Sequence, residues 1–308
     1  MEDYLLTILG SSVDYFYEAE SYPIEGDFSH ARYTGSSAGG CPFNAGAVAA
    51  SKKISVKALD MLGKDDESTA FLISEARRLN MDCENIIIRE KVSNGKVIII
   101  NTGDKRTMFV VDPIRPHYEV DEKMQDLLNS SKYAYSLLHI INRSFSSIEP
   151  LLEAKRHGSR IIIDGTSKYD DPIRVKMLYD LADGLFINKT DYQRLKKHSS
   201  EDPKTILFNN NAEFICVTDG SNGTHLYTKD KEYYAESVKN INVKDSTGAG
   251  DSFAGTFLAC LIKGFEYERA LRYASISGAY ACTVLGGLGG VASFEALENF
   301  AKEHNYDL

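Results

Sequence analysis

The chain has 308 residues, with 35 Lys and Arg against 44 Asp and Glu, and therefore a formal net charge of −9. An apolar fraction of 43% is enough to build a large core, which excludes disorder for most of the chain. The acidic balance argues against a protein that binds nucleic acid through a basic face. Its five cysteines are widely spaced without a C-x-x-C pair, which excludes a disulfide framework and a zinc site.

The N-terminal residues are acidic where a signal peptide needs positive charge. No stretch approaches the about 18 consecutive apolar residues of a membrane helix. We therefore expect a cytoplasmic protein that has neither a membrane nor a nucleic acid as its partner.

Strand-like and helix-like runs alternate along most of the chain. A branched apolar run at 5–9 predicts a strand covered on both faces, followed by a loop-like run at 10–14. A helix of small residues at 44–50, a strand at 54–59 and an amphipathic helix at 66–79 come next. Later strands are expected at 133–138, 160–164, 184–187 and 214–218, a hairpin at 224–227 and 232–237, and helices at 249–262, 267–284 and 294–304. This order predicts an α/β fold with a mostly parallel central sheet between helical layers.

Two segments interrupt the alternation. Residues 15–36 are polar and rich in tyrosine, and residues 96–100 and 107–111 are apolar strands around a polar turn at 103–106. A turn of this kind between two strands predicts a hairpin. We expect both segments to form a small β-sheet lid, inserted at about 14–38 and 94–111 into a single α/β domain spanning 1–308.

The segment 242–253 carries the clearest chemistry. Gly248 and Gly250 let the backbone approach a ligand, and an apolar helix follows at once. A glycine-rich turn that leads into a helix N-terminus presents free N–H groups, which favour an anion. Asp251 would repel a bound phosphate there, unless it serves as a general base toward a hydroxyl during phosphoryl transfer. Alternatively, Asp251 only complements the helix dipole.

The run D-S-T-G-A-G-D at 245–251 resembles the C-terminal signature of the pfkB family of ribokinase-like carbohydrate and nucleoside kinases. The run G-G-C-P-F-N-A-G at 39–46 resembles its N-terminal signature. Further similarities follow in order at 10–14, 63–65, 94–111 and 218–223, so the resemblance spans nearly the whole chain. It implies a ribokinase-like three-layer α/β/α fold with a small β-sheet lid.

The resemblance also implies a role for each matching residue. Catalysis would fall to Asp251 as general base and to an anion hole formed by the backbone N–H groups of Gly248, Ala249 and Gly250. Substrate hydroxyls would be held by Asp14, Gly39, Gly40 and Asn44. The residues expected to contact ATP are Asn188, Thr218, Gly220 and Gly223.

Two metal ions are implied beside ATP. Asp191 stands where the family has a Glu that organises Mg²⁺ and its waters, and a water could bridge the missing methylene. Alternatively, Asp191 is only an N-terminal charge on its helix. Asp245 and Thr247 resemble ligands of the monovalent cation, K⁺, that activates many members, but the run at 285–293 is more glycine-rich than the family pattern.

The implied function is an ATP-dependent kinase that transfers the γ-phosphoryl group to a hydroxyl of a small sugar. Asp14 and Asn44 suit a neutral polyhydroxylated ligand, whereas tyrosines of the first lid segment could stack a nucleobase and make the protein a nucleoside kinase. An acidic or phosphorylated sugar would need a cation, and the candidates by chain position are Lys91, Arg106 and Arg115.

Two further alternatives concern partners and catalysis. Lid residues Tyr15, Phe16, Phe109 and Val111 either bury a homodimer contact or simply cover the substrate. A non-catalytic binding protein on the same fold is less favoured, because such a protein would be expected to lose Asp251 or the glycines before it.

Overall fold

The computed structural model describes residues 3–8, 10–103, 105–165 and 169–308. Its larger sheet has nine strands in the order β13-β12-β11-β10-β9-β8-β1-β4-β5. In chain order these are β1 (Tyr4–Ile8), β4 (Ser55–Gly63), β5 (Ile86–Arg89), β8 (Tyr133–Leu137), β9 (Arg160–Asp164), β10 (Gly184–Asn188), β11 (Phe214–Thr218), β12 (Thr224–Tyr227) and β13 (Glu232–Ala235). Neighbouring strands from β5 to β11 are parallel, and β12 pairs antiparallel with both of its neighbours. The expected mostly parallel sheet is confirmed.

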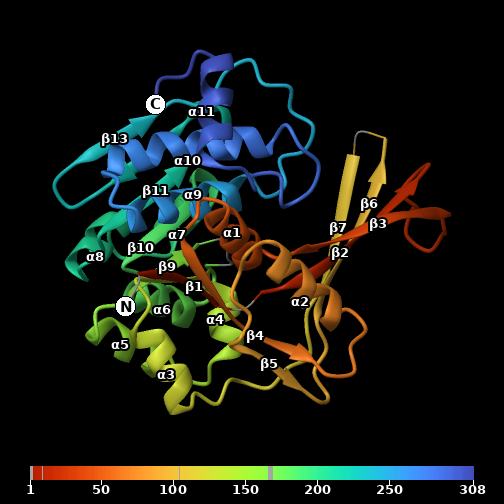
Figure 1. Ribbon diagram of the computed structural model, residues 1–308, viewed down its shortest axis with the longest axis horizontal. Coiled ribbons are helices and arrows are strands. Elements are labelled where there is room, and N and C mark those ends of the chain that lie inside the picture. Colours follow the sequence, from red (N-terminus) through yellow and green to blue (C-terminus); the bar gives the residue numbers. More distant parts are fainter. Residues whose placement is uncertain (1–2, 9, 104, 166–168) are drawn as a thin grey trace.

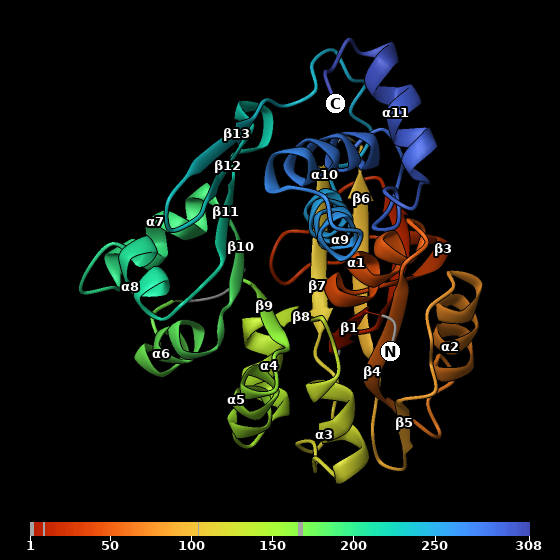
Figure 2. The same cartoon turned by 60° about the vertical axis from the view of Figure 1, so that its left-hand side comes forward.

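Helices cover both faces of this sheet (Figures 1 and 2). One face packs against α3 (Glu122–Asn129), α4 (Leu138–Ser144), α5 (Glu149–Arg156), α6 (Pro172–Leu181), α7 (Lys189–Lys197) and α8 (Pro203–Asn209). The other packs against α1 (Cys41–Ala50), α2 (Thr69–Arg78), α9 (Ala249–Ile262) and α10 (Tyr267–Ala281), with α11 (Phe294–Glu303) against α10. In β9, Ile161 and Ile163 pack in the core on the face covered by α3 to α8, and Ile162 packs in the core on the opposite face. Strand alternation requires this pattern.

The contact between α1 and α9 depends on small residues. Ala45 and Ala49 of α1 share a core with Ala254 and Leu258 of α9. A Cβ at Gly255 would clash with the Ala45 carbonyl, so glycine lets the two backbones touch. This close packing places the first turn of α9 beside α1.

The smaller sheet stands away from the larger one (Figure 1). Its strand order is β3-β2-β6-β7, with β2 (Ser12–Ala19), β3 (Ala31–Gly39), β6 (Gly95–Thr102) and β7 (Lys105–Val111). Residues 12–14, expected in a loop, already pair with both neighbouring strands, and Lys105 and Arg106, expected in the turn, belong to β7. Both differences come from pairing between distant segments. Leu9 and Asp104, which we expected to end the first strand and to lie in the turn, are outside the described residues.

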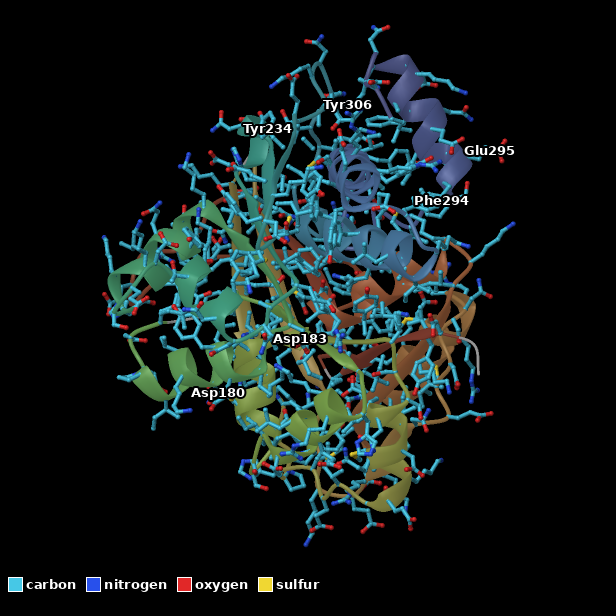
Figure 3. The ribbon with its side chains drawn as sticks, turned by 90° about the vertical axis from the view of Figure 1, so that its left-hand side faces the viewer. Asp180, Asp183, Tyr234, Phe294, Glu295 and Tyr306 are labelled. Carbon is cyan, nitrogen blue, oxygen red and sulfur yellow. The ribbon has the colours of Figure 1, made fainter. Side chains whose placement is uncertain are left out.

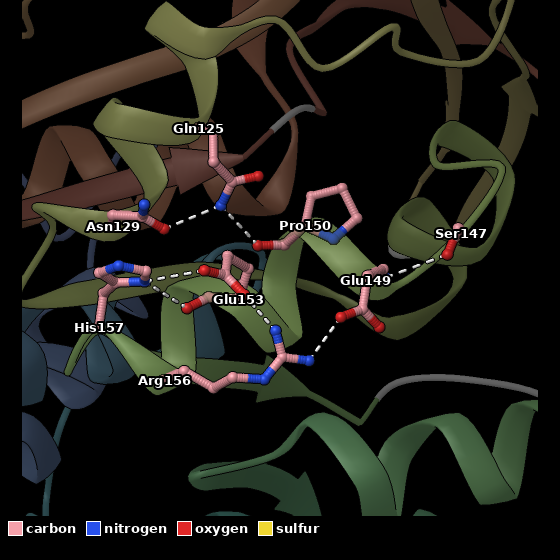
Figure 4. Close-up of polar contacts among 8 residues, drawn as sticks. All are labelled: Gln125, Asn129, Ser147, Glu149, Pro150, Glu153, Arg156 and His157. Carbon is pink, nitrogen blue, oxygen red and sulfur yellow. Dashed lines mark hydrogen bonds and ion pairs between the residues drawn. The ribbon is translucent and has the colours of Figure 1, made fainter.

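A polar network on the outer surface joins α3 to α5 (Figure 4). Gln125 donates to the Pro150 carbonyl at 3.0 Å, and Arg156 pairs with Glu149 and Glu153 of its own helix. Exposed ion pairs of this kind contribute little to stability. Across the described residues, no helix combines the length and apolar character needed to cross a membrane.

The α1–α9 contact predicts a glycine-specific stability effect. Gly255→Ala should lower the free energy of unfolding by about 1–3 kcal/mol, because the new Cβ overpacks a backbone contact. Gly250→Ala in the same helix, where a Cβ would meet no described atom within 4 Å, should leave stability equal or higher. Urea denaturation of both variants checks this, and equal destabilisation of the two would contradict it.

Candidate active site

The residues predicted to form the site gather at one edge of the larger sheet. β9 ends at Asp164, β10 at Asn188 and β11 at Thr218, and β2 leaves from the same end of β1. In the register of the parallel strands, Asn188 lies beside Thr218. The carboxyl ends of parallel strands form the usual ligand site of such sheets.

Asp251 lies in the first turn of α9 and is only 8% exposed. Its Oδ2 accepts a hydrogen bond of 2.8 Å from Asn44 Nδ2 of α1. Burial raises the pKa of Asp251 to about 7, opposed by the Asn44 bond and supported by the charges of Asp164 and Asp14. The carboxyl group can therefore take up and release a proton near neutral pH.

Asn44 has a second polar atom to offer. Its Oδ1 is buried and has no hydrogen-bond partner among the residues that the structure describes. A buried amide oxygen without a partner costs free energy, and a hydroxyl donor from a bound ligand would satisfy it.

Asp14 lies near the start of β2 and is buried. Burial raises its pKa to about 6, against the opposing effects of the Ser12 hydroxyl and the Arg106 charge. A Cβ at Gly39 would lie 2.5 Å from Asp14 Oδ2, and Gly40 has a φ of +100° with the Gly10 carbonyl directly against it. Gly39 thus gives the Asp14 carboxylate its space, and Gly40 lets the chain pass directly against the Gly10 carbonyl.

The N-terminus of α9 is open. Gly248 adopts a φ of +72° at the N-cap, and no side chain of the described residues caps the helix. A Cβ at Gly248 would clash with the Gly287 carbonyl. The backbone of the glycine-rich run at 285–293 therefore packs directly against this turn. Ala249 N donates to the Ser246 carbonyl at 3.3 Å, whereas the N–H groups of Gly248 and Gly250 donate to no described residue. An open N-terminus with free N–H groups suits an anion.

Asp245 and Thr247, predicted as cation ligands, contact Arg106 of β7. Arg106 Nη1 lies 2.7 Å from Asp245 Oδ1 and also contacts Thr247 Oγ1. Burial opposes ionisation, but hydrogen bonds from Thr247 and Gly286 together with the Arg106 charge hold the pKa of Asp245 below its usual value. The smaller sheet is therefore tied to the segment that leads into α9.

The predicted nucleotide-contacting residues lie at the ends of β10 and β11. Asn188 caps α7, and its Nδ2 donates to Asp191 Oδ2 at 2.7 Å. Gly220 and Gly223 border the 3₁₀ turn η1 (Gly220–Asn222) that follows Thr218. Tyr234 of β13, labelled in Figure 3, donates its hydroxyl to the Asn222 carbonyl at 2.9 Å. The turn is thus held against the sheet edge.

Two residues of the site were missed by sequence reasoning. The Cys41 thiol, at the start of α1, hydrogen-bonds to Asp251 and thereby lowers the pKa of that carboxyl. Asp164, whose Oδ2 accepts from the Tyr135 hydroxyl at 3.3 Å, raises the same pKa through its charge. The position of Asp164 at the carboxyl end of an expected strand was the available signal, whereas nothing in the sequence pointed to Cys41.

The other candidate cations lie elsewhere. Arg115 Nη1 pairs with buried Asp60 at 3.1 Å, and Asp60 also accepts from the Ser11 backbone N–H at 3.0 Å. This pair therefore fixes the chain just before β2. Lys91 is exposed in a turn.

Comparison with known proteins agrees with this geometry. Residues 4–291 match the domain described as pfkB family carbohydrate kinase. A 5-dehydro-2-deoxygluconokinase of Halalkalibacterium halodurans is 23% identical over 90% of this chain and 87% of its own. A nucleoside kinase of Methanocaldococcus jannaschii is 23% identical over 86% of this chain and 85% of its own.

Solved structures show the same fold. Arabidopsis thaliana ribokinase in complex with ribose and ATP has a TM-score of 0.83 at 20% identity, covering 98% of this chain and 99% of its own. An Escherichia coli protein in complex with ATP and Mg²⁺ has a TM-score of 0.79 at 19% identity, covering 99% and 100%. The ribokinase-like fold is thus confirmed.

The chain belongs to the pfkB family of carbohydrate kinases. It is a phosphotransferase with an alcohol group as acceptor, and its relatives act on sugars or nucleosides.

The raised pKa of Asp251 predicts a pH-dependent stability effect. The folded protein holds this proton more tightly than the unfolded chain, so the stabilising contribution is complete below pH 3.8 and is lost as the pH rises through about 7. Asp251→Asn is neutral at every pH, so its melting temperature should exceed that of the wild type by a few degrees at pH 8 and by less at pH 5.

Scanning calorimetry at the two pH values measures this difference. The exposed Asp230→Asn serves as the matched control and should melt with the wild type at both. A gap that widens toward pH 5 would show that Asp251 is not the group held neutral by burial.

Proposed function

We propose that this protein transfers the γ-phosphoryl group of ATP to a hydroxyl of a small sugar, with Asp251 as general base. The observation that carries the proposal is one buried carboxylate with a pKa of about 7 at the open N-terminus of α9. A base with this pKa is matched to proton transfer at neutral pH. Charge complementation of the helix alone would not require burial of the group.

In the proposed step, each bond that forms is matched by a bond that breaks. The acceptor oxygen forms a bond to the γ-phosphorus while its proton passes to an Asp251 carboxylate oxygen. The bond from the γ-phosphorus to the β,γ-bridging oxygen breaks, and ADP leaves with that electron pair. Backbone N–H groups of Gly248 and Gly250, with the first turn of α9, hold the charge on the transferring group.

Asp191 fits a role toward Mg²⁺. Among the described residues, Oδ1 accepts one bond from Arg194 at 2.9 Å and Oδ2 one from Asn188 at 2.7 Å. Each oxygen then keeps a lone pair for a metal-bound water. The described residues contain no cluster of three or more metal-ligating side chains, as expected when phosphates supply much of the coordination. When bound, Mg²⁺ would neutralise charge on those phosphates.

The acceptor pocket suits hydroxyl groups. Asp14 and Asn44 Oδ1, which has no partner among the described residues, can both accept hydrogen bonds. Asn44 is bonded to the proposed base, and the charge of Asp14 raises the pKa of that base. Strand alternation puts Tyr15 and Tyr17 on the face of β2 opposite to Asp14, and Tyr15 packs on the core. This arrangement favours a sugar over a nucleoside, for which Phe16 would be the stacking residue on the Asp14 face.

The smaller sheet is proposed as a lid over the acceptor, where closure would exclude water. Phe109 and Val111 are 48% and 45% exposed and alternate with Arg106, so they face away from the site. This apolar face is the part of the lid that would pair two subunits.

A coupled ADP-release screen tests the function. Mg-ATP is supplied with pentoses, hexoses, deoxy-keto acids, sugar phosphates and nucleosides. Asp251→Asn should reduce turnover of the best acceptor by about 10²–10⁴-fold, whereas exposed Asp230→Asn should retain it. Turnover of nucleosides alone would establish the alternative acceptor, and turnover that survives in Asp251→Asn would refute the assigned base.

The pH profile provides a second check. Asp251 must be ionised to accept a proton, so kcat/KM for the acceptor should fall about tenfold for each unit below a pKa near 7. Steady-state rates between pH 5 and 9 measure this limb. A profile that is flat down to pH 5 would contradict the proposal.

A further inference from the structure

The glycine-rich run at 285–293, unusual for the family, is connected at its start to Asp245. Gly286 N donates to Asp245 Oδ2 at 3.0 Å. Asp245 Oδ1 accepts from the Thr247 backbone N–H at 3.0 Å, from the Thr247 hydroxyl at 2.6 Å and from Arg106 at 2.7 Å. Four donors thus meet one carboxylate, and three of them share a single oxygen.

This donor set does not fit a bound monovalent cation. A carboxylate offers about four lone-pair positions, and a cation at Asp245 Oδ1 would meet the Arg106 guanidinium at hydrogen-bond distance. Thr247 Oγ1 faces the same guanidinium. The side chains that the family resemblance assigns to K⁺ already hold a positive group of the protein.

The end of the same run also holds the Lys52 amine, whose pKa burial lowers to about 7. The Lys52 side chain is 1% exposed, and its Nζ donates to the Ala292 carbonyl at 2.6 Å and to the Gly290 carbonyl at 3.4 Å. Ser51 Oγ lies 3.2 Å from the same nitrogen. Two carbonyls and a hydroxyl around one amine nitrogen are the kind of oxygen shell that would otherwise suit a monovalent ion.

Neutralisation of the Asp245 carboxylate by a positive group affects the neighbouring anion hole. Asp245 lies three residues before Gly248, and its uncompensated charge would repel a phosphate bound at the α9 N-terminus. Arg106 cancels this charge at an ion pair whose side chains are only 24% and 13% exposed. Such a pair is screened by salt much less than a surface pair.

We propose that Arg106 replaces the monovalent cation at Asp245, so that phosphoryl transfer by this protein does not depend on K⁺. The inference rests on the proposed kinase function and concerns the same site. Arg106 reaches Asp245 because β7 of the smaller sheet runs beside the segment entering α9 (Figure 1). The guanidinium of Arg106 then neutralises the Asp245 carboxylate, as a dissociable K⁺ ion would otherwise do.

The first test compares rates in K⁺ and in tetramethylammonium at equal ionic strength, with the acceptor found in the screen. Wild-type kcat should agree within about twofold between the two salts. Arg106→Gln should be slower in tetramethylammonium, and K⁺ should restore part of the loss. Lys105→Gln, on the same strand and exposed, is the matched control and should behave as the wild type. Stimulation of the wild type by about tenfold or more in K⁺ would overturn the inference.

The second readout needs no turnover. The wild-type melting temperature should be the same in both salts, whereas that of Arg106→Gln should rise with K⁺ in a saturable way. A K⁺-specific rise in the wild type, or no K⁺ response of Arg106→Gln in either assay, would refute the replacement. If the melting curves agree with the prediction but no acceptor is turned over, the result counts against the proposed function and leaves the cation assignment standing.

Discussion

Contact between the backbones of α1 and α9 is the constraint on which the site depends. Gly255 against the Ala45 carbonyl permits an approach that no other residue would allow. Because the helices touch, Asn44 reaches Asp251 and both side chains are removed from water. Burial then raises the pKa of Asp251, so a packing contact between small residues sets the chemistry of a carboxyl group.

Negative charge dominates the pocket. Asp14 and Asp164 both disfavour ionisation of Asp251, whereas hydrogen bonds from Asn44 and Cys41 favour it. Burial raises the pKa of Asp14, and the charge of Arg106, which enters from the smaller sheet, offsets part of that rise. The position of this sheet therefore affects the electrostatics of the pocket as well as its access to solvent.

Much of the fold follows from local pattern. The bounds of α9 agree with the expected 249–262, because glycines precede a long apolar run and give the helix a clear start. The sequence pattern did not predict β5, because a strand of four residues at the sheet edge shows little periodicity. Arg106 had no local signal for its role either: its partner Asp245 lies 139 residues away, and only the register of β7 brings the two together. The role of Asp251, in contrast, could be predicted from the sequence because its whole motif is contiguous.

The residues of the site lie far apart in the sequence, and this separation affects when the site forms during synthesis and folding. Asn44 and Asp251 are 207 residues apart, and such long-range contacts form late because loop closure must come first. As the chain leaves the ribosome, its N-terminal half carries Asp14 and Asn44 without the proposed base. A nascent or C-terminally truncated chain thus lacks the group that would let it consume ATP, and phosphoryl transfer becomes available only after α9 has docked.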